Sequence, residues 1–197
     1  MGGVFILLAA AGASRRMRGA DKLLEKVEGE PILRRAAQAA LRTGQPVLVT
    51  LPKGNAERAA ALDGLALEAK EIDASEGMAA SLRTGVAAAR EAGANGVLVM
   101  LADMPEIETN ALRRLIAAFE GAPDKITRAA TDSGQPGNPV ILPARLFTAL
   151  YSVTGDTGAR AVVQSETPIL CPLPGKAAIT DLDTPEDWAA WRAKTGR

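Results

Sequence analysis

The sequence predicts an α/β protein in which a mostly parallel sheet is covered by helices on both faces. Two observations predict this fold. Apolar runs of strand length alternate along the 197 residues with Ala-rich stretches of helical spacing. The first three of these runs are apolar at almost every position, as expected for strands that are buried on both sides. Because no linker, repeat or low-complexity segment interrupts the pattern, we expect one domain over 1–197.

Strands are predicted where short apolar runs are bounded by turn-forming residues. The clearest are VFILLAA (4–10), PVLVTL (46–51), GVLVMLAD (96–103) and NPVILP (138–143). After about residue 125 the rhythm loosens, and two further strands are expected in KITRAAT (125–131) and in the Pro-flanked TPILCPLP (167–174).

Helices are predicted where apolar residues recur every three or four positions. These segments are 31–44, 55–65, 78–93 and 110–121, followed by a short helix over 156–164 and a closing helix over 184–196. Gly44, Gly93 and Gly121 stand where helices commonly stop, and Pro185 suits the first turn of the closing helix.

The composition excludes several kinds of chemistry. The chain has no histidine, which excludes Ser–His–Asp and Cys–His catalysis and His-ligated zinc. Its one cysteine, Cys171, cannot build a thiolate cage or an internal disulfide. A bound metal would therefore have carboxylate, carbonyl and water ligands, which favours a hard ion such as Mg²⁺.

The charge balance and the N-terminus narrow the setting. Basic and acidic residues number 23 each, so we expect binding to neither nucleic acid nor membrane, and any anion site must be local. The first apolar run is only as long as a strand and follows no basic segment, so neither a signal peptide nor a membrane span is predicted. A cytoplasmic protein is expected.

The loop after the first strand concentrates cations behind a small-residue turn. In an open α/β sheet, ligands bind beyond the carboxyl ends of the strands. Gly12 lets backbone N–H groups approach an anion there, and Arg15, Arg16, Arg18 and Lys22 follow within ten residues. The spacing matches neither the P-loop of NTPases nor the dinucleotide fingerprint. A solvated basic turn is the alternative.

The order of residues in this loop, AAGASRRM followed by DKLL, resembles the signature of the MobA-like nucleotidyltransferase family, and most closely its members that transfer a cytidylyl group to molybdenum cofactor. The resemblance implies a single-domain, Rossmann-like fold of the nucleotide-diphospho-sugar transferase type. It implies that Arg16 and Lys22 are catalytic and neutralise charge on the triphosphate and the leaving pyrophosphate. It also implies a nucleotide phosphate site on the backbone of Ala10, Ala11, Gly12, Ala13 and Ser14.

Acidic residues at two places suit a metal. Asp103 ends a buried strand within LADMP, where an ionised carboxylate needs a cation or donors; a helix cap or Asx-turn is the alternative. Asp181 and Asp183 alternate as on one face of a strand, just before a helix that Asp183 or Thr184 would cap. The resemblance implies that Asp103 and Asp183 bind the catalytic Mg²⁺, and Asp103 is the third expected catalytic residue.

Two further segments resemble the family. In SEGMAASLRTG (75–85), the resemblance implies contacts of Gly77, Met78 and Ser81 with the base and ribose, although a capped helix start is equally compatible. GQPGNPVIL (134–142) and TGDTGARAV (154–162) resemble the segments that meet the acceptor. The implied acceptor residues are Gly134, Gly137, Asn138 and Asp156, with Arg160 nearby. Gly134, Gly137 and Asn138 are expected to leave room for a bulky ligand. Asn138 departs from the His that cytidylyl-transferring relatives usually carry, and a capped helix is the alternative at Asp156.

The predicted reaction is attack of a terminal phosphate of molybdenum cofactor on the α-phosphorus of CTP, with release of pyrophosphate. The acceptor phosphate is largely dianionic at neutral pH, so no general base is required. Ala11, where guanylyl-transferring relatives usually have Gly, favours CTP over GTP. The alternatives are GTP transfer to the same cofactor, transfer to a sugar or polyol phosphate, and a non-catalytic cofactor chaperone. A molybdoenzyme or its chaperone would be the protein partner.

Overall fold

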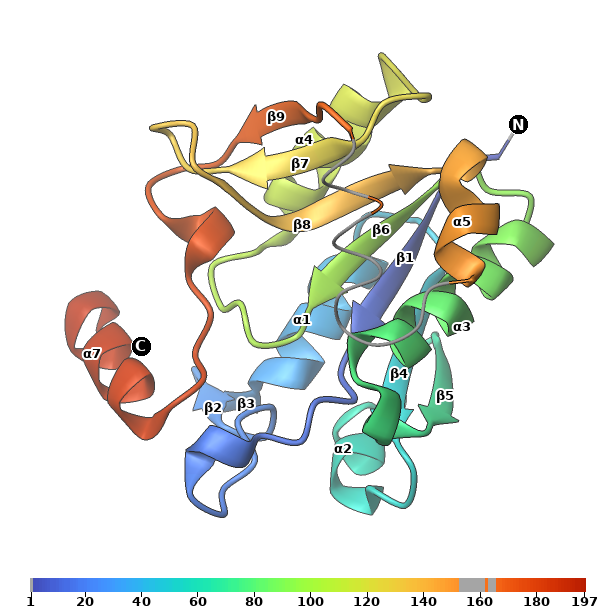
Figure 1. Ribbon diagram of the computed structural model, residues 1–197. Coiled ribbons are helices and arrows are strands. Elements are labelled where there is room, and N and C mark those ends of the chain that lie inside the picture. The colour runs from blue at the N-terminus through green and yellow to red at the C-terminus, as the bar shows by residue number, and fades with distance from the viewer. Residues whose placement is uncertain (1, 153–161, 163–165) are drawn as a thin grey trace.

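The computed structural model describes residues 2–152, 162 and 166–197, which build a seven-stranded sheet in the order β5-β4-β1-β6-β8-β7-β9 (Figure 1). Within this sheet β8 alone runs antiparallel to its neighbours, so the mostly parallel sheet that the sequence predicts is confirmed. The strands are β1 (Val4–Ala9), β4 (Val47–Pro52), β5 (Glu68–Ile72), β6 (Gly96–Leu101), β7 (Thr127–Ala130), β8 (Pro136–Pro143) and β9 (Ile169–Pro172). Two short strands of two residues each, β2 (Lys26–Val27) and β3 (Glu30–Pro31), pair as an antiparallel hairpin that is not part of this sheet.

Helices cover both faces of the sheet, as predicted (Figure 1). One face packs against α1 (Ile32–Leu41) and α4 (Thr109–Glu120), the other against α3 (Met78–Glu91) and α5 (Phe147–Tyr151). Alternate residues of β1 enter the two cores: Ile6 and Leu8 face α1, while Leu7 faces α3. The unbroken apolar run of β1 therefore reflects burial on both sides. The described residues also form the helices α2 (Ala56–Ala61) and α7 (Pro185–Thr195). Their short 3₁₀ turns are η1 (Arg15–Met17), η2 (Ala74–Glu76), η3 (Ala144–Leu146) and η4 (Ala177–Ile179).

The sequence pattern missed β5, α5 and the β2–β3 hairpin. β5 reads EAKEI and leaves four of its five side chains exposed at the sheet edge, so it lacks both the apolar run and the alternation by which strands are recognised. Charged side chains suit an edge because they discourage pairing with another chain. At the opposite edge, β9 is protected by Pro168 and Pro172.

Two local predictions turn out differently, and a third is not tested. Gly93 does end its helix with a left-handed φ of 63°, but Gly121, at φ −70°, stays right-handed after α4. Residues 181–183 form irregular chain and not the strand face that the alternation suggested. The predicted short helix over 156–164 lies, apart from Val162, outside the described residues. In the described part of the chain, no helix combines the length and the apolar character needed to cross a membrane.

Candidate functional site

A cavity of about 840 Å³ opens at the carboxyl ends of β1 and β6, where the predicted phosphate loop leaves the sheet. Figure 1 shows the arrowheads of both strands pointing toward this loop and toward the start of α3. The lining residues are Ala9, Ala11, Gly12, Ala13, Ser14, Arg15, Arg16, Lys22, Leu23, Ala74, Ser75, Glu76, Gly77, Met78, Ser81, Leu101, Ala102, Asp103, Asp181 and Asp183. One cavity thus brings together three segments that are separate in the sequence: the loop after β1, the acidic residues expected to bind a metal, and the segment expected to contact the base.

Two cations and two carboxylates meet at the floor of the cavity. The Lys22 Nζ lies 2.5 Å from Asp103 Oδ2 and 2.5 Å from Asp183 Oδ1, so one ammonium group bridges both carboxylates. The guanidinium of Arg16 lies 2.6 Å from the second oxygen of Asp183. Lys22 is 14% exposed and Arg16 is 70% exposed, so the lysine lies inside the cluster and the arginine at its rim.

Asp183 reaches this cluster through the return of the chain after β9. The backbone N–H of Leu182 donates to the Asp103 carbonyl at 3.1 Å, which ties the two segments together. Thr184 then caps α7 in a reciprocal capping box with Asp187, which confirms the expected cap. A second bond joins the C-terminal part of the chain to the segment after β6: the Trp191 indole donates to Glu106 at 3.1 Å. Long-range contacts, and not local strand geometry, therefore place Asp183 beside Asp103.

The donor set fits a hard divalent cation that is shared with substrate. Asp103 Oδ1 is buried and has no hydrogen-bond partner among the described residues, so one oxygen of this carboxylate remains without a donor. The described segments contain no group of three or more Asp, Glu, Cys or His side chains placed to hold a metal. Mg²⁺ is typically held by one or two carboxylates together with substrate phosphates and water. Asp103 and Asp183 match that arrangement.

Burial and neighbouring charge act in opposite directions on the pKa of Lys22 and in the same direction on the pKa of Asp181. Burial alone would lower the pKa of Lys22, but the charges and hydrogen bonds of Asp103 and Asp183 outweigh it and raise that pKa above its ordinary value. Lys22 is therefore protonated at neutral pH. For Asp181, burial and then the negative charge of Asp183 raise the carboxyl pKa.

The loop glycine, Gly12, borders open space, since a Cβ there would meet no atom within 4 Å.

The remaining loop cations have separate positions. Arg15 lines the cavity. Arg18, which the sequence left without a role, adopts a left-handed φ of 53° and pairs with Glu186 on α7 at 2.7 Å. Because both side chains of that pair are mostly exposed, it contributes little to stability.

Ala10, which the resemblance implied for the phosphate site, does not line the cavity. Its N–H donates to Thr50 and its carbonyl accepts from Arg58, whose side chain is only 2% exposed. Arg58 also pairs with Asp21. Sequence reasoning missed this arginine because it occupies the middle of an Ala-rich helix, 37 residues from its acidic partner, and no motif marks it.

The segment that the resemblance assigns to the base borders the same cavity as the loop. Gly77, Met78 and Ser81 all line the cavity at the start of α3. The Ser81 hydroxyl is buried and accepts from Thr50 Oγ1 at 3.0 Å, so a residue of β4 orients it. Thr50 is a second residue that the sequence did not single out, because it is one position within an apolar strand.

The acceptor segment is separate from this cavity. Gly134, Gly137 and Asn138 do not line it, and Asp156 lies outside the described residues. The reason proposed for Gly137 is corrected. A Cβ there would lie 1.9 Å from the Ala178 carbonyl oxygen, so η4 fills the space that a bulky ligand was expected to use. Gly134 is exposed in a turn with φ 87°, and Asn138 is half-buried.

Replacing Gly137 by alanine should destabilise the protein by about 1–3 kcal/mol, because the backbone of η4 must move to admit a methyl group. Gly121→Ala is the matched control, since its Cβ would meet its nearest atom at an ordinary 3.5 Å and its φ is −70°. Denaturant unfolding of both variants checks this. A Gly137→Ala protein as stable as Gly121→Ala would contradict the packing described.

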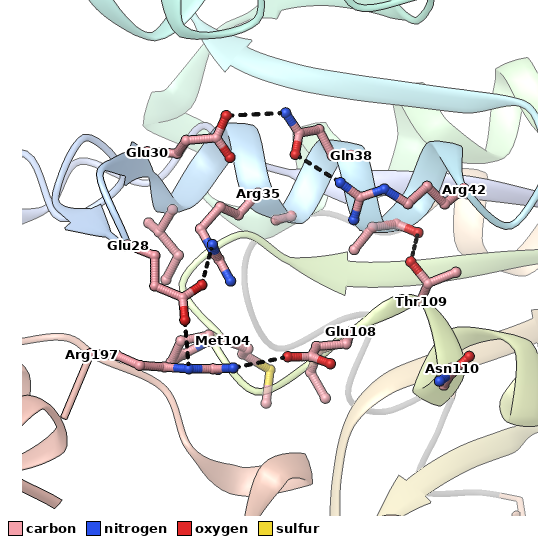
Figure 2. A pocket seen from close by; sticks show the side chains of 15 residues that line it. Glu28, Glu30, Arg35, Gln38, Arg42, Met104, Glu108, Thr109, Asn110 and Arg197 are labelled. Atoms are coloured by element: carbon pink, nitrogen blue, oxygen red, sulfur yellow. Dashed lines mark hydrogen bonds and ion pairs between the residues drawn. The ribbon is translucent and has the colours of Figure 1, made fainter. Parts of the chain in front are cut away.

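A second cavity, of about 360 Å³, lies between α1 and the start of α4 (Figure 2). Its charged side chains largely satisfy one another: Glu28 accepts from Arg35 at 2.8 Å and from Arg197 at 3.2 Å. Arg197 also reaches Glu108, as Figure 2 shows. The ion pairs leave no concentrated charge of one sign toward the cavity, in contrast to the phosphate loop.

Comparison with known proteins finds a matching family and a relative that covers most of the chain. Residues 6–169 match the MobA-like NTP transferase domain. The purine catabolism protein PucB of Bacillus subtilis is 27% identical over 94% of this chain and 93% of its own length.

Solved structures show the same fold. Rv0371c from Mycobacterium tuberculosis is 25% identical, with a TM-score of 0.83 and 96% of each chain covered; its manganese complex superimposes with a TM-score of 0.78, at 24% identity over 95% of this chain and 97% of that one. A CMP-2-keto-3-deoxy-manno-octonic acid synthetase in complex with CTP is 11% identical, with a TM-score of 0.75 and 99% of each chain covered. The fold is that of nucleotide-diphospho-sugar transferases, as the sequence predicted.

Proposed function

We propose, since the chain belongs to the family of MobA-like NTP transferase domains, that this nucleotidyltransferase moves CMP from CTP to the terminal phosphate of molybdenum cofactor and releases pyrophosphate. One observation carries the proposal: a Gly-containing loop with two cations shares a single cavity with a pair of carboxylates suited to Mg²⁺. Binding a nucleotide alone does not require this combination, whereas transferring a nucleotidyl group does.

The reaction balances without a protein base. An oxygen of the acceptor phosphate forms a bond to the α-phosphorus, the bond from that phosphorus to the bridging oxygen breaks, and pyrophosphate leaves with the electron pair. A phosphomonoester has a second pKa of about 6, so the acceptor oxygen is already anionic at neutral pH. This accounts for an active site without histidine.

The chain's own contribution is position and charge. Ala11, Gly12 and Ala13 line the cavity, and their backbone N–H groups would hold the phosphates of the nucleotide. Arg16 and Lys22 lie at the adjoining floor and neutralise the charge that develops on the leaving pyrophosphate. Mg²⁺, held by Asp103 and Asp183, would supply further neutralisation and orient the phosphates.

CTP is the proposed nucleotide because of the residue beside the loop glycine. Ala11 lines the cavity and packs with Ile72 and Ala80, so its methyl group occupies a defined place at the wall. That methyl would narrow the space that a purine needs. Discrimination of this kind is worth about 1–3 kcal/mol, or about 10- to 150-fold in rate.

Pyrophosphate release in the presence of Mg²⁺ and molybdenum cofactor tests the proposal. With CTP, GTP, ATP and UTP offered separately, CTP should be used best, and Ala11→Gly should improve use of GTP by about tenfold relative to CTP. Pyrophosphate release with GTP alone would contradict the assignment of CTP as the nucleotide. CTP turnover with a sugar or polyol phosphate, but not with the cofactor, would contradict the assignment of molybdenum cofactor as the acceptor. Cofactor binding without any release would indicate a chaperone.

A further inference from the structure

We propose that Arg58, a residue of α2 outside the cavity, is a positioning residue that sets the conformation of the phosphate loop; the proposal rests on the nucleotidyltransferase function proposed above. The loop is residues 10–22, from the end of β1 to Lys22. Arg58 contacts it at three separated points, at its beginning, its middle and its end.

The contacts use almost all of the guanidinium. Nε and one terminal nitrogen donate to the two oxygens of Asp21 at 2.7 and 2.8 Å, which is a bidentate pair. The other terminal nitrogen donates to the Ala10 carbonyl at 2.6 Å. A further N–H reaches Ser14 Oγ at 3.1 Å. Four of the five N–H groups of arginine are therefore engaged with this one loop.

Hydrogen bonds within the loop join the same residues that Arg58 contacts, Ser14 and Asp21. Ser14 Oγ donates to Asp21 Oδ1 at 3.1 Å and accepts from the Lys22 backbone N–H at 3.3 Å. Ser14 has a left-handed φ of 49°, which a non-glycine residue adopts when surrounding contacts impose it. Burial raises the pKa of Asp21, but hydrogen bonds from Arg58 outweigh it, so the carboxylate is charged at neutral pH.

The position of Lys22 depends on this network. Lys22 directly follows Asp21, and its backbone N–H bonds to Ser14, so the network fixes where its side chain leaves the loop. From there Lys22 bridges Asp103 and Asp183. The three-residue turn η1 is too short to order residues 10–22 by itself. We therefore expect the phosphate site to lose its geometry when Arg58 can no longer reach all three points.

The test compares Arg58→Lys with wild type and with Arg34→Lys. Lysine keeps the charge but cannot make the bidentate and branching contacts. Arg34 is the matched control because its guanidinium also donates to two backbone carbonyls, those of Ala61 and Asp63, but it touches no residue of the loop in the described structure. If Arg58→Lys does not fold, Asp21→Asn, which alters the same pair from the loop side, takes its place.

The first readout is limited trypsin digestion, with cleavage after Arg15, Arg16 and Arg18 followed by mass spectrometry. We expect cleavage within the loop to be at least tenfold faster in Arg58→Lys than in wild type or Arg34→Lys. The second readout is calorimetric binding of inorganic tripolyphosphate with Mg²⁺, which does not depend on the base. We expect the dissociation constant of Arg58→Lys to rise at least tenfold with unchanged stoichiometry.

The outcomes separate the two proposals. A purely structural role for Arg58 would lower the binding stoichiometry and leave the dissociation constant unchanged, and this would overturn the inference. Cleavage of Arg58→Lys at the wild-type rate would also overturn it. A wild-type protein that binds no tripolyphosphate, combined with faster loop cleavage in Arg58→Lys, would overturn the proposed function and still support Arg58 as the residue that orders the loop.

Discussion

Replacing Asp103 by asparagine should lower the turnover number about a thousandfold or more and leave the fold intact. The substitution preserves the volume of a side chain that is only 11% exposed, but it removes a negative charge from the cluster that holds Lys22. It also replaces one carboxylate oxygen by an NH₂ group, which cannot coordinate a cation. Loss of electrostatic stabilisation at the reacting phosphate accounts for the expected magnitude.

The measurement is steady-state pyrophosphate release, together with a thermal melt. Asp124→Asn is the matched control, because that aspartate is exposed and does not line the cavity. Full activity in Asp103→Asn would contradict the proposed role of Asp103 in the reaction. An unfolded Asp103→Asn protein would instead assign it a structural role.

Replacing Lys22 by methionine should have two opposite effects. Turnover should fall about a hundredfold or more, because the cation that we propose to face the leaving pyrophosphate is lost. Binding of Mn²⁺ in the absence of nucleotide should become about tenfold tighter. The wild-type cluster balances Arg16 and Lys22 against Asp103 and Asp183, so a free divalent ion must compete with the ammonium group. Without Lys22, the carboxylates attract the ion more strongly.

Calorimetry or electron paramagnetic resonance with Mn²⁺ measures the second effect. Arg18→Met is the matched control, because it removes a cation of the same loop that pairs with Glu186 and does not line the cavity. If Lys22→Met bound Mn²⁺ more weakly than Arg18→Met, Lys22 would not be a competitor of the metal. Unchanged turnover would show that another group neutralises the pyrophosphate.

Elements with strong local patterns could be predicted from the sequence. β1, β4 and β6 are recognisable because burial on both faces requires apolar residues at successive positions. The cap of α7 at Thr184 is equally local, since its partner Asp187 lies three residues away. β5 could not be predicted, because an exposed edge strand of charged residues carries no hydrophobic signal.

In the site, the residue types were predictable and their neighbours were not. The order of residues from Ala11 to Lys22 suggested the loop that we propose for the phosphates, and the LADMP motif around Asp103 suggested one carboxylate, because both signals are local. Gly137 shows the opposite case: its position is conspicuous in the sequence, but the reason for a glycine there is the backbone of Ala178, which no local pattern reveals.

Residue type and short-range spacing were enough to predict the class of fold and to exclude histidine chemistry, and the order of residues after β1 led us to propose a phosphate site there. Only the folded chain brings Lys22 between Asp103 and Asp183, which lie 81 and 161 residues away from it. The same is true of Arg58, which reaches the loop from a neighbouring helix. Ion pairs between distant segments leave no periodicity in the chain, since their partners meet only when the strands pair and the helices pack.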